Sequence, residues 1–586
     1  MNFFEKLKLL DVLRLTLSGQ SAFFGSKSLG ARFAECVMTC VGRSADASKI
    51  DFGNVEAATG IRRNAYKTAE GCIDRLPGKR WADALSPDLE IDFWLLVQKF
   101  FFDELYTKFE FIEMALRYAE EHPDETYTIT VDKEYLGAYA DVLKRHFAVG
   151  YSRNTSMLGV SSLLLLPLFI EFFWRRKGEA GELAYNNHIV CEVDGEKTLE
   201  MFSTLFRTVP KDKLAFVVEQ RNAADFSDKH GIGVLGLRRE GLRYLRRKVW
   251  AYMGCSLRHR REVAAFGSRL FRIFYVLMQG RAEVVEGSGN VYCTYEHLVT
   301  VKAVRNEFLK SSGNKTVFVP MNAHVTPQYF HSEILVNYDV ICAAGQHTET
   351  LYRRKRALTQ MFLPTGSYDS HRGVVGQVDR EERIARLKAF KGDALAITII
   401  SPGICDPTYG HEVKLMHLAR TLSKVPGLRV FVRLKPVPPL PKYAHFYEEH
   451  TAGCEGVLLT SGEYELFDFL ELSDLFVTSI SNAAFDLAQT GAQVMFIDYL
   501  RDPELHLCLS VIPGVRLTEE ESLATIVGWV ENRQQARAAW AQKMKFFSGH
   551  IAYRFPDFEV YRRNFLTQIS GVDAVLRLAA PASEPA

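Results

Sequence analysis

From residue 186 onward, short apolar runs alternate with amphipathic segments of helical length. Continuous apolar runs such as Leu214 to Glu219, Val291 to Thr294 and Leu428 to Leu434 predict strands that are buried on both faces. Between such runs, segments with helical spacing of apolar residues predict helices, such as Lys197 to Arg207, Tyr464 to Leu472 and Glu519 to Glu531. This alternation is typical of βα units whose strands form a parallel sheet. The sequence therefore predicts an α/β fold.

A polar stretch at 366–392 divides this α/β part into two. With 586 residues the chain is long enough for more than one large domain. We expect a first Rossmann-like domain over 186–370 and a second, also Rossmann-like, over 371–578. Residues 1–185 are expected to form a helical N-terminal region, and the short Ala/Pro-rich tail at 579–586 to be disordered.

Two apolar segments of the N-terminal region bear on membranes. Residues 1–25 carry charges inside their apolar pattern, which predicts an amphipathic helix rather than a signal peptide. The apolar segment 157–174 is nearly long enough to cross a bilayer and is followed by three basic residues. Pro167 and Glu171 interrupt it, so a buried or interfacial helix is the expected structure.

The segment 238–280 interrupts the first α/β domain with eleven Lys and Arg residues. Aromatic and aliphatic residues lie between them, and only Glu240 and Glu262 oppose the charge. Basic helices with aromatic residues on the other face suit an anionic membrane surface, whereas a solvated helical hairpin is the structural alternative. Nucleic acid ranks last as a partner, because no known reading motif accompanies the charge.

Composition narrows the class of protein further. The ten Cys are scattered singly, without a CxxC pair or a Cys/His cluster of zinc spacing, which fits reduced thiols in a cytoplasm and predicts no metal site. No GxxxxGK[ST] loop and no GxSxG elbow occur, which disfavours a P-loop NTPase and an α/β-hydrolase. With 47% hydrophobic and 24% charged residues, wholesale disorder is excluded.

Residues 473–499 predict a strand, a short polar turn, a helix, a Gly break and a second strand. Ser479, Ser481 and Asn482 cluster where this helix begins, and the free N–H groups of a helix start attract a phosphate. Asp486 lies about one turn further along the same face, within reach of a ribose attached to that phosphate. Ordinary helix caps of a packed α/β unit would explain the same residues equally well.

Other candidates follow the predicted strands of the second domain, because ligands of open α/β sheets bind outside the carboxyl ends of the strands. Ser401 and Gly403 allow close approach of an anion, and Lys435 can offset phosphate charge; plain turn residues and a solvated lysine are the alternatives. The predicted donor-binding residues are Ser401, Gly403, Lys435, Thr478, Ser479, Ser481, Asn482 and Asp486.

In the first domain, four side chains beside predicted strand ends are candidates for a general base. They are Asp194, Glu296, His324 and His347. Their spacing singles out none of them. Helix capping is the structural alternative at His347 and is the expected role of the neighbouring Thr348.

With two α/β domains, a hinge and a phosphate-plus-ribose pattern in the second domain, the chain resembles the GT-B class of nucleotide-sugar glycosyltransferases over roughly 186–570. In that class an acidic residue five positions before a Gly holds the donor ribose, which matches Asp486 and Gly491. Small polar residues at the preceding helix start bind the donor diphosphate there. A Lys-Pro at a strand end followed by SDLFVTSISNAAFDLAQTG also resembles bacterial surface-polysaccharide enzymes, such as the CDP-glycerol glycerophosphotransferases and capsule sialyl- and Kdo-transferases.

This resemblance implies a cytoplasmic transferase, peripheral on the inner face of the plasma membrane, that needs neither cofactor nor metal. It implies a nucleotide-sugar donor and a glycan or glycolipid acceptor, namely a surface polysaccharide such as a capsule or its lipid-linked precursor. Residues 157–177 and 238–280 are the expected membrane contacts. The alternatives are a CDP-glycerol-type polyol-phosphate transferase, a nucleotide-sugar epimerase and a non-catalytic GT-B scaffold of a polysaccharide assembly complex.

Overall fold

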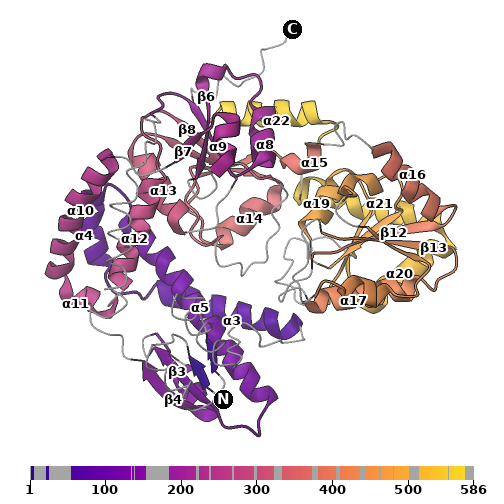
Figure 1. Ribbon diagram of the computed structural model, residues 1–586, viewed down its shortest axis with the longest axis horizontal. Helices are drawn as coiled ribbons and strands as arrows, with labels where there is room; N and C mark the ends of the chain where they lie inside the picture. Colours follow the sequence, from indigo (N-terminus) through magenta and orange to yellow (C-terminus); the bar gives the residue numbers. More distant parts are fainter. Residues whose placement is uncertain are drawn as a thin grey trace.

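The computed structural model holds three β-sheets, whose described strand pairs are all parallel (Figure 1). Two of these sheets are large and carry helices on both sides, as the apolar runs predict. The structure describes residues 2–4, 22–24, 55–132, 135–137, 139–152, 184–219, 224–235, 239–266, 269–295, 300–321, 333–372, 380–403, 409–435, 443–460, 463–479, 481–499, 514–551 and 553–573.

The first α/β domain is built on a seven-stranded sheet of order β11-β10-β9-β8-β5-β6-β7. Its strands are β5 (Ile189–Val193), β6 (Leu214–Glu219), β7 (Gly233–Leu235), β8 (Val291–Thr294), β9 (Lys315–Phe318), β10 (Val340–Ala343) and β11 (Met361–Pro364). Its helices are α8 (Glu196–Leu205), α9 (Ala224–His230), α10 (Arg239–Arg258), α11 (Arg260–Val263), α12 (Arg269–Ala282), α13 (Thr300–Ser311), α14 (Gln346–Arg354) and α15 (Tyr368–Arg372). The chain starts at the centre, moves outward to β7, and returns to β8 beside β5, which is the doubly wound order of a Rossmann fold.

The second α/β domain repeats this order in a six-stranded sheet, β14-β13-β12-β15-β16-β17. Its strands are β12 (Leu395–Ile400), β13 (Leu428–Arg433), β14 (Val457–Thr460), β15 (Leu475–Thr478), β16 (Val494–Ile497) and β17 (Arg516–Leu517). Its helices are α16 (Arg380–Lys391), α17 (Tyr409–Leu422), α18 (Phe446–Thr451), the 3₁₀ helix η6 (Leu466–Phe469), α19 (Asn482–Gln489), α20 (Glu519–Glu531) and α21 (Arg533–His550). Two Rossmann-like domains in succession define the GT-B architecture, so the predicted fold class is confirmed.

The last helix that the structure describes, α22 (Phe558–Ser570), returns from the second domain to the first. It lies beside α8, β11 and α15, as Figure 1 shows in yellow above the first sheet. Tyr561, Phe565 and Leu566 belong to the same apolar cluster as the strands β5 and β8, and the Phe565 ring packs edge-on to Phe206 at 5.9 Å. The first domain is therefore completed by the final turns of the chain.

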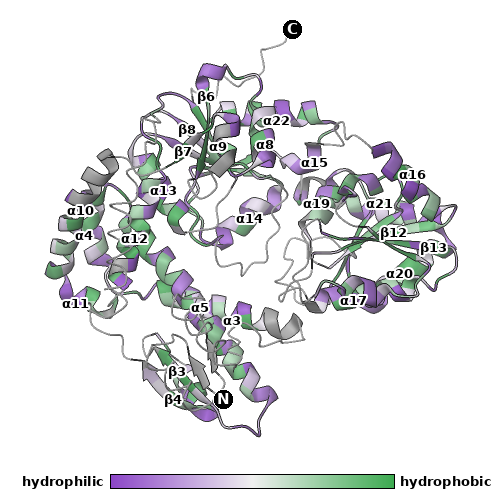
Figure 2. Ribbon diagram, viewed as in Figure 1, coloured by the Kyte–Doolittle hydropathy of each residue, from purple (hydrophilic) through white to green (hydrophobic). Residues whose placement is uncertain are grey.

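The N-terminal part packs against the first domain rather than standing apart from it. It contains α3 (Val55–Ile73), α4 (Lys79–Leu89), α5 (Phe93–Glu121) and α6 (Tyr139–His146). Residues of α5 share one apolar cluster with Val190, Val217 and Tyr292 of the first sheet. Helix α3 also contacts α17 of the second domain. Figure 2 shows the apolar residues gathered in the two large sheets and along these helices.

Three predictions of local structure are corrected. The N-terminal region holds more strands than the one short strand that the sequence predicts at Tyr127 to Val131, where β3 (Thr128–Asp132) lies. With β3, the strands β1 (Asn2–Phe4), β2 (Ala22–Phe24) and β4 (Ala148–Ser152) form a third sheet of order β2-β1-β3-β4. The amphipathic helix expected over 1–25 is accordingly wrong at both ends, where β1 and β2 pair with each other. The helix expected at Tyr464 to Leu472 is the short η6, whose start is capped by Asp468 accepting from the Glu465 N–H at 2.9 Å.

The apolar segment 157–174 lies outside the described residues. Within the part of the chain that the structure describes, no helix is long and apolar enough to cross a membrane.

The two α/β domains meet at the carboxyl end of the first sheet. The Tyr553 N–H, which follows α21, donates to the carbonyl of Ala344 at 2.8 Å, directly after β10. Ala344 is also part of the apolar core of the second domain. Helix α15, which follows β11, contacts α19 of the second domain. The loops that follow β10 and β11 therefore face the second domain, as a site between two Rossmann-like domains requires.

Candidate functional site between the two Rossmann-like domains

The predicted donor-binding residues gather where the strand order of the second sheet reverses. Strands β12 and β15 lie side by side, with Val477 paired to Ile399, and the chain leaves them in opposite directions across the sheet. Thr478 Oγ1 donates to the carbonyl of Ile400 at 3.0 Å and joins the two strand ends. Ligands of doubly wound sheets bind at this kind of switch point. Ser401, Gly403, Thr478 and Ser479 all fall on these two strand ends.

Helix α19 begins directly above the switch point. Ser481 is its N-cap in extended conformation, yet its side chain forms no capping hydrogen bond. Ser479 is 1% exposed, and its Oγ has no hydrogen-bond partner among the described residues. Backbone N–H groups in the first turn of a helix have no intrahelical acceptor. The Ser479 hydroxyl, the non-capping Ser481 side chain and this helix start form a set of donors suited to an anion.

The far end of α19 is fixed by backbone geometry and by a basic side chain. Gly491 follows the helix with φ +89°, a left-handed conformation that favours glycine, and so ends the helix as the sequence predicts. The Arg554 guanidinium donates to the carbonyl of Thr490 at 3.2 Å. A cation at the C-terminal end of α19 complements the negative end of the helix dipole. The positive end of the dipole lies at the helix start, beside the switch point.

Gly403 and Lys435 lie against each other beside β12 and β13. Gly403 has φ +91°, and a Cβ at this position would lie 2.8 Å from Lys435 Cδ. The aliphatic part of Lys435 therefore crosses the backbone of Gly403. Lys435 is exposed and has no ion-pair partner among the described residues. Its ammonium group is available to offset the charge of a phosphate at the strand ends.

Ser401, which the sequence predicts to bind the donor, makes a hydrogen bond within the second domain. Its hydroxyl donates to Glu412 Oε1 at 2.7 Å, and the Gly403 N–H donates to the same oxygen at 2.9 Å. The side chain of Glu412, near the start of α17, is fully buried. Burial raises the pKa of Glu412 to about 7, against the opposing hydrogen bonds from Ser401, Gly403 and Tyr447. Ser401 and Glu412 therefore hold the loop that presents Gly403 and Lys435.

Asp486 lies on α19 where the two domains touch. It is 6% exposed, and its Oδ1 accepts a hydrogen bond from Ser370 Oγ of α15 at 2.6 Å. Ser370 is joined in turn to Ser367 at 2.6 Å, and Ser367 to Gln489 at 3.3 Å. The sequence places Ser367 at the expected hinge between the domains, but sequence reasoning did not find Ser370, because only the folded chain brings it to α19. The residue predicted to hold a ribose is thus also a contact between the domains.

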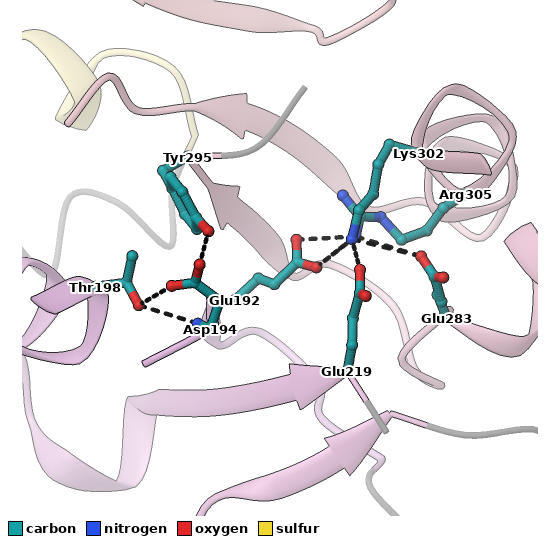
Figure 3. A network of polar contacts seen from close by, with 8 residues as sticks. All are labelled: Glu192, Asp194, Thr198, Glu219, Glu283, Tyr295, Lys302 and Arg305. Atoms are coloured by element: carbon teal, nitrogen blue, oxygen red, sulfur yellow. Dashed lines mark hydrogen bonds and ion pairs between the residues drawn. The ribbon is translucent and has the colours of Figure 1, made fainter. Parts of the chain in front are cut away.

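Asp194 is the described general-base candidate that solvent reaches. It follows β5 and is exposed, and its Oδ1 accepts from Thr198 Oγ1 at 2.7 Å (Figure 3). Its Oδ2 accepts from the Tyr295 hydroxyl, which comes directly after β8. These two bonds fix the carboxylate at the switch point of the first sheet, between β5 and β8. Sequence reasoning missed Tyr295 and Thr198 as its partners.

His347 is placed differently from Asp194. It lies in the first turn of α14 and is buried, and burial, followed by the charge of His550, lowers the pKa of its imidazole to about 4. An imidazole of this pKa is neutral but weakly basic near pH 7, which makes it a poor general base. Thr348 caps the helix by accepting from the Gly345 N–H at 3.4 Å, as expected. Glu296 and His324 lie outside the described residues.

A buried ionic cluster lies next to Asp194, below the same strand ends (Figure 3). Lys302 Nζ lies 2.6 Å from Glu192 and 3.5 Å from Glu283, and also pairs with Glu219. Arg305 Nη1 lies 2.8 Å from Glu192 Oε2, and its guanidinium carbon lies 4.9 Å from the centroid of the Tyr292 ring. The only sequence signal for it is an acidic residue inside the apolar strand segment at Glu192.

The cluster has a definite charge distribution. Burial opposes ionisation of Glu192, but Arg305 and Lys302 lower its pKa to about 2. Burial lowers the pKa of Lys302 to about 8, although Glu192 opposes this change. Glu192 and Arg305 are therefore charged near pH 7, and both are almost inaccessible to solvent. The cluster is suited to holding β5, β6 and α13 together rather than to contacting a substrate.

No protein-family model and no curated protein matches the chain. Solved structures align over most of it at low identity. A UDP-N-acetylglucosamine 2-epimerase from Listeria monocytogenes is 10% identical, with 69% of this chain and 100% of that chain covered, at a TM-score of 0.38. The wall teichoic acid polymerase TagF is 11% identical, with 72% and 98% covered, at 0.39. MnaA from S. aureus with UDP is 9% identical, with 68% and 100% covered, at 0.40.

Proposed function

We propose that this protein is a glycosyltransferase, which transfers a sugar from a nucleotide-activated donor to a bacterial surface polysaccharide or its lipid-linked precursor. The observation that carries the proposal is the start of α19 at the β12/β15 switch point. There the buried hydroxyl of Ser479 has no partner, the side chain of Ser481 caps nothing, and Asp486 follows about one turn later. These are donors for a phosphate with a carboxylate placed for the attached ribose.

In this proposal, the start of α19, Asp486, Lys435 and Gly403 have distinct roles in binding the donor. The N–H groups at the start of α19 and the Ser479 hydroxyl bind the donor phosphates, and Asp486 accepts hydrogen bonds from the ribose hydroxyls. Lys435 neutralises part of the charge that develops on the departing nucleotide phosphate. Gly403 permits this, because any Cβ would displace the Lys435 side chain.

In the first domain, Asp194 acts as general base. An acceptor hydroxyl oxygen attacks the anomeric carbon of the sugar, and the bond from that carbon to the nucleotide phosphate oxygen breaks. The nucleotide leaves with the bonding electron pair, and the hydroxyl proton passes to Asp194. Tyr295 and Thr198 hold the carboxylate in place for this transfer. No metal ion takes part in this scheme, and the reaction occurs at the inner face of the plasma membrane.

The first test is a thermal-shift panel of UDP, CDP, CMP, GDP, ADP and TDP, since a ligand of the native state raises its melting temperature. Wild type and Asp486→Ala are compared with Ser370→Ala, which removes the same interdomain hydrogen bond but keeps the carboxylate. We expect one nucleotide to stabilise wild type and Ser370→Ala but not Asp486→Ala. If no nucleotide stabilises wild type, the proposal is wrong and a non-catalytic scaffold becomes the better account.

The second test separates transfer from epimerisation. The nucleotide-sugar that matches the stabilising nucleotide is incubated with the protein, with and without a membrane fraction as the source of acceptor. A transferase releases nucleotide and labels the acceptor only when both substrates are present. Conversion of the free nucleotide-sugar to an epimer without acceptor would contradict transfer, and transfer of a polyol phosphate from CDP-glycerol would correct the donor class.

A further inference from the structure

Helix α10 presents an outward stripe of apolar side chains. Among the described residues, the two most exposed large hydrophobic side chains are Trp250, at 79%, and Leu257, at 63%. They stand seven positions apart, which places them on one face of the helix about two turns from each other. An isolated exposed hydrophobic residue is ordinary, but two on one face of a helix form an apolar patch along that face.

Arginine side chains surround this pair. Arg247 precedes Trp250 by three positions on α10, so helical spacing brings the two to the same side. Arg258 ends α10 directly after Leu257, Arg261 lies in α11 just beyond it, and both are exposed. Arg260 opens α11 and is exposed as well. None of the four has an ion-pair partner in the described part of the chain. Lys248, one position from Arg247, pairs instead with Glu90 of α4 at 3.3 Å.

The opposite face of α10 fixes the orientation of the stripe. Trp81 of α4 donates from its indole nitrogen to Ser256 Oγ at 3.2 Å, and the Tyr252 hydroxyl donates to the Leu270 carbonyl at 2.7 Å. Both Tyr252 and Ser256 are buried. The outward side chains therefore cannot turn inward without breaking this packing. Figure 1 shows α10 at the outer left edge of the molecule, far from the second α/β domain.

We propose that this surface, called here the α10 stripe, binds an anionic lipid bilayer. It consists of Arg247, Trp250, Leu257, Arg258, Arg260 and Arg261. A tryptophan ring favours the headgroup level of a membrane, and an exposed leucine gains when it leaves water for the acyl boundary. Unpaired arginines at the same level are attracted to anionic headgroups. The exposed Leu257 favours a bilayer over a nucleic acid as the partner, because a phosphate backbone offers no apolar region to an aliphatic side chain.

Co-sedimentation of the full chain with vesicles tests the proposal without substrate, so its outcome is independent of the proposed transferase activity. We expect wild type to bind phosphatidylcholine vesicles that contain about one third phosphatidylglycerol, and to bind pure phosphatidylcholine weakly. Replacing Arg258 and Arg261 together by Gln should weaken binding at least about tenfold, and added salt should weaken binding of wild type. The matched control replaces Arg537 and Lys545 of α21 by Gln, which removes the same charge elsewhere and should leave binding unchanged.

The apolar half of the stripe has its own test. Trp250→Leu should keep vesicle binding, since leucine is apolar, but should lose the fluorescence quenching that brominated lipids cause in wild type. Trp250→Ala should bind at least several-fold more weakly, whereas Leu358→Ala, at another exposed hydrophobic position, should bind as wild type does. Unchanged melting temperatures show that the variants fold.

Three results would overturn the proposal. The first is equal binding of wild type to neutral and anionic vesicles, or no binding to either. The second is quenching of wild type and Trp250→Leu to the same extent. The third is a wild-type dimer in sedimentation velocity that Trp250→Ala converts to monomer, because the α10 stripe would then be a self-association surface.

Discussion

Ser370 Oγ donates a hydrogen bond to Asp486 Oδ1 at 2.6 Å, across the contact between the two α/β domains. The two residues are 116 positions apart, on α15 and α19. Because both are buried, water does not replace the bond if it is lost. The carboxylate proposed for nucleotide binding therefore makes this hydrogen bond only when the two domains are in contact as in the structure.

This relationship predicts a measurable coupling. Ser370→Ala and Asp486→Ala should each lower stability, and the double variant should be less destabilised than the sum, by about 1–2 kcal/mol, because both single changes break the same hydrogen bond between two buried side chains. Melting temperatures and denaturant unfolding of the four proteins measure the cycle. Strict additivity would show that the two side chains do not act on each other in solution.

Glu412 predicts a stability that falls on the alkaline side. Its pKa is raised by burial from 4.5 to about 7, so the folded chain holds this proton more tightly than the unfolded chain does. The resulting stabilisation is complete below about pH 4.5 and is lost as the pH rises through about 7. Glu412→Gln is uncharged at every pH, so its stability relative to wild type should increase between about pH 5 and pH 8, by roughly 3 kcal/mol.

Denaturant unfolding of Glu412→Gln and wild type at these two pH values measures this difference. Glu448→Gln, at an exposed position of α18, is the control that should show no such trend. A constant difference between Glu412→Gln and wild type at both pH values would mean that Glu412 is ionised throughout.

His371 predicts the opposite pH dependence, namely a stability that falls as the pH falls. Its Nδ1 lies 2.9 Å from the Ser367 carbonyl, and its Nε2 accepts from the Phe555 N–H at 3.3 Å, which requires the neutral ring. Burial lowers the pKa of this imidazole, against the opposing effect of the hydrogen bond that it donates to the Ser367 carbonyl. The folded chain thus binds this proton less tightly than the unfolded chain, and stability is present above the unfolded pKa of about 6.5 and lost as the pH falls.

His371→Phe keeps a ring against Tyr561, on which His371 stacks at 4.6 Å, but cannot titrate. We expect it to be less stable than wild type by about 1–2 kcal/mol near pH 8, because the Phe555 N–H loses its acceptor. The gap should narrow near pH 5, where wild type pays for protonation. Melting curves at both pH values give the result, with His417→Gln at an exposed site as reference. A gap that widens in acid would contradict the neutral ring.

In the buried ionic cluster, replacing one charged residue should lower stability more than replacing two that pair with each other. Arg305→Met leaves Glu192 buried with less compensation and should destabilise by about 3–5 kcal/mol. In the double variant Glu192→Met and Arg305→Met, Lys302 keeps Glu219 as its partner, so the double variant should melt above Arg305→Met alone. Melting temperatures decide, and a double variant less stable than both single ones would mean that the cluster contributes net stability.

Much of the fold follows from apolar runs. Strands β6 and β8 occupy the residues predicted, because parallel strands buried on both faces need continuous apolar sequence, and helix α20 also has the predicted bounds. The pairing of Asn2–Phe4 with Ala22–Phe24 was missed, since strands of three residues leave no periodic pattern. The short helix α15 was missed for the same reason of length.

The candidate site was predictable only in part. Positions at strand ends, such as Ser479 and Asp194, follow from topology, because carboxyl ends of parallel strands share one edge. Their partners do not: Tyr295 lies 101 residues from Asp194, and no local pattern encodes that hydrogen bond. Ser401 and Glu412 are only 11 residues apart in the sequence. Their hydrogen bond nevertheless depends on the conformation of the loop between them, which the residue types alone do not determine.

The order of synthesis gives α22 a consequence for folding. Phe558–Ser570 leaves the ribosome after the whole second domain, yet its side chains cover apolar residues of β5 and β8. The first domain emerges earlier but holds that surface uncovered until Phe558–Ser570 appears. Its completion must therefore follow the second domain, and a nascent chain stalled before residue 558 would present an apolar face for a chaperone to protect.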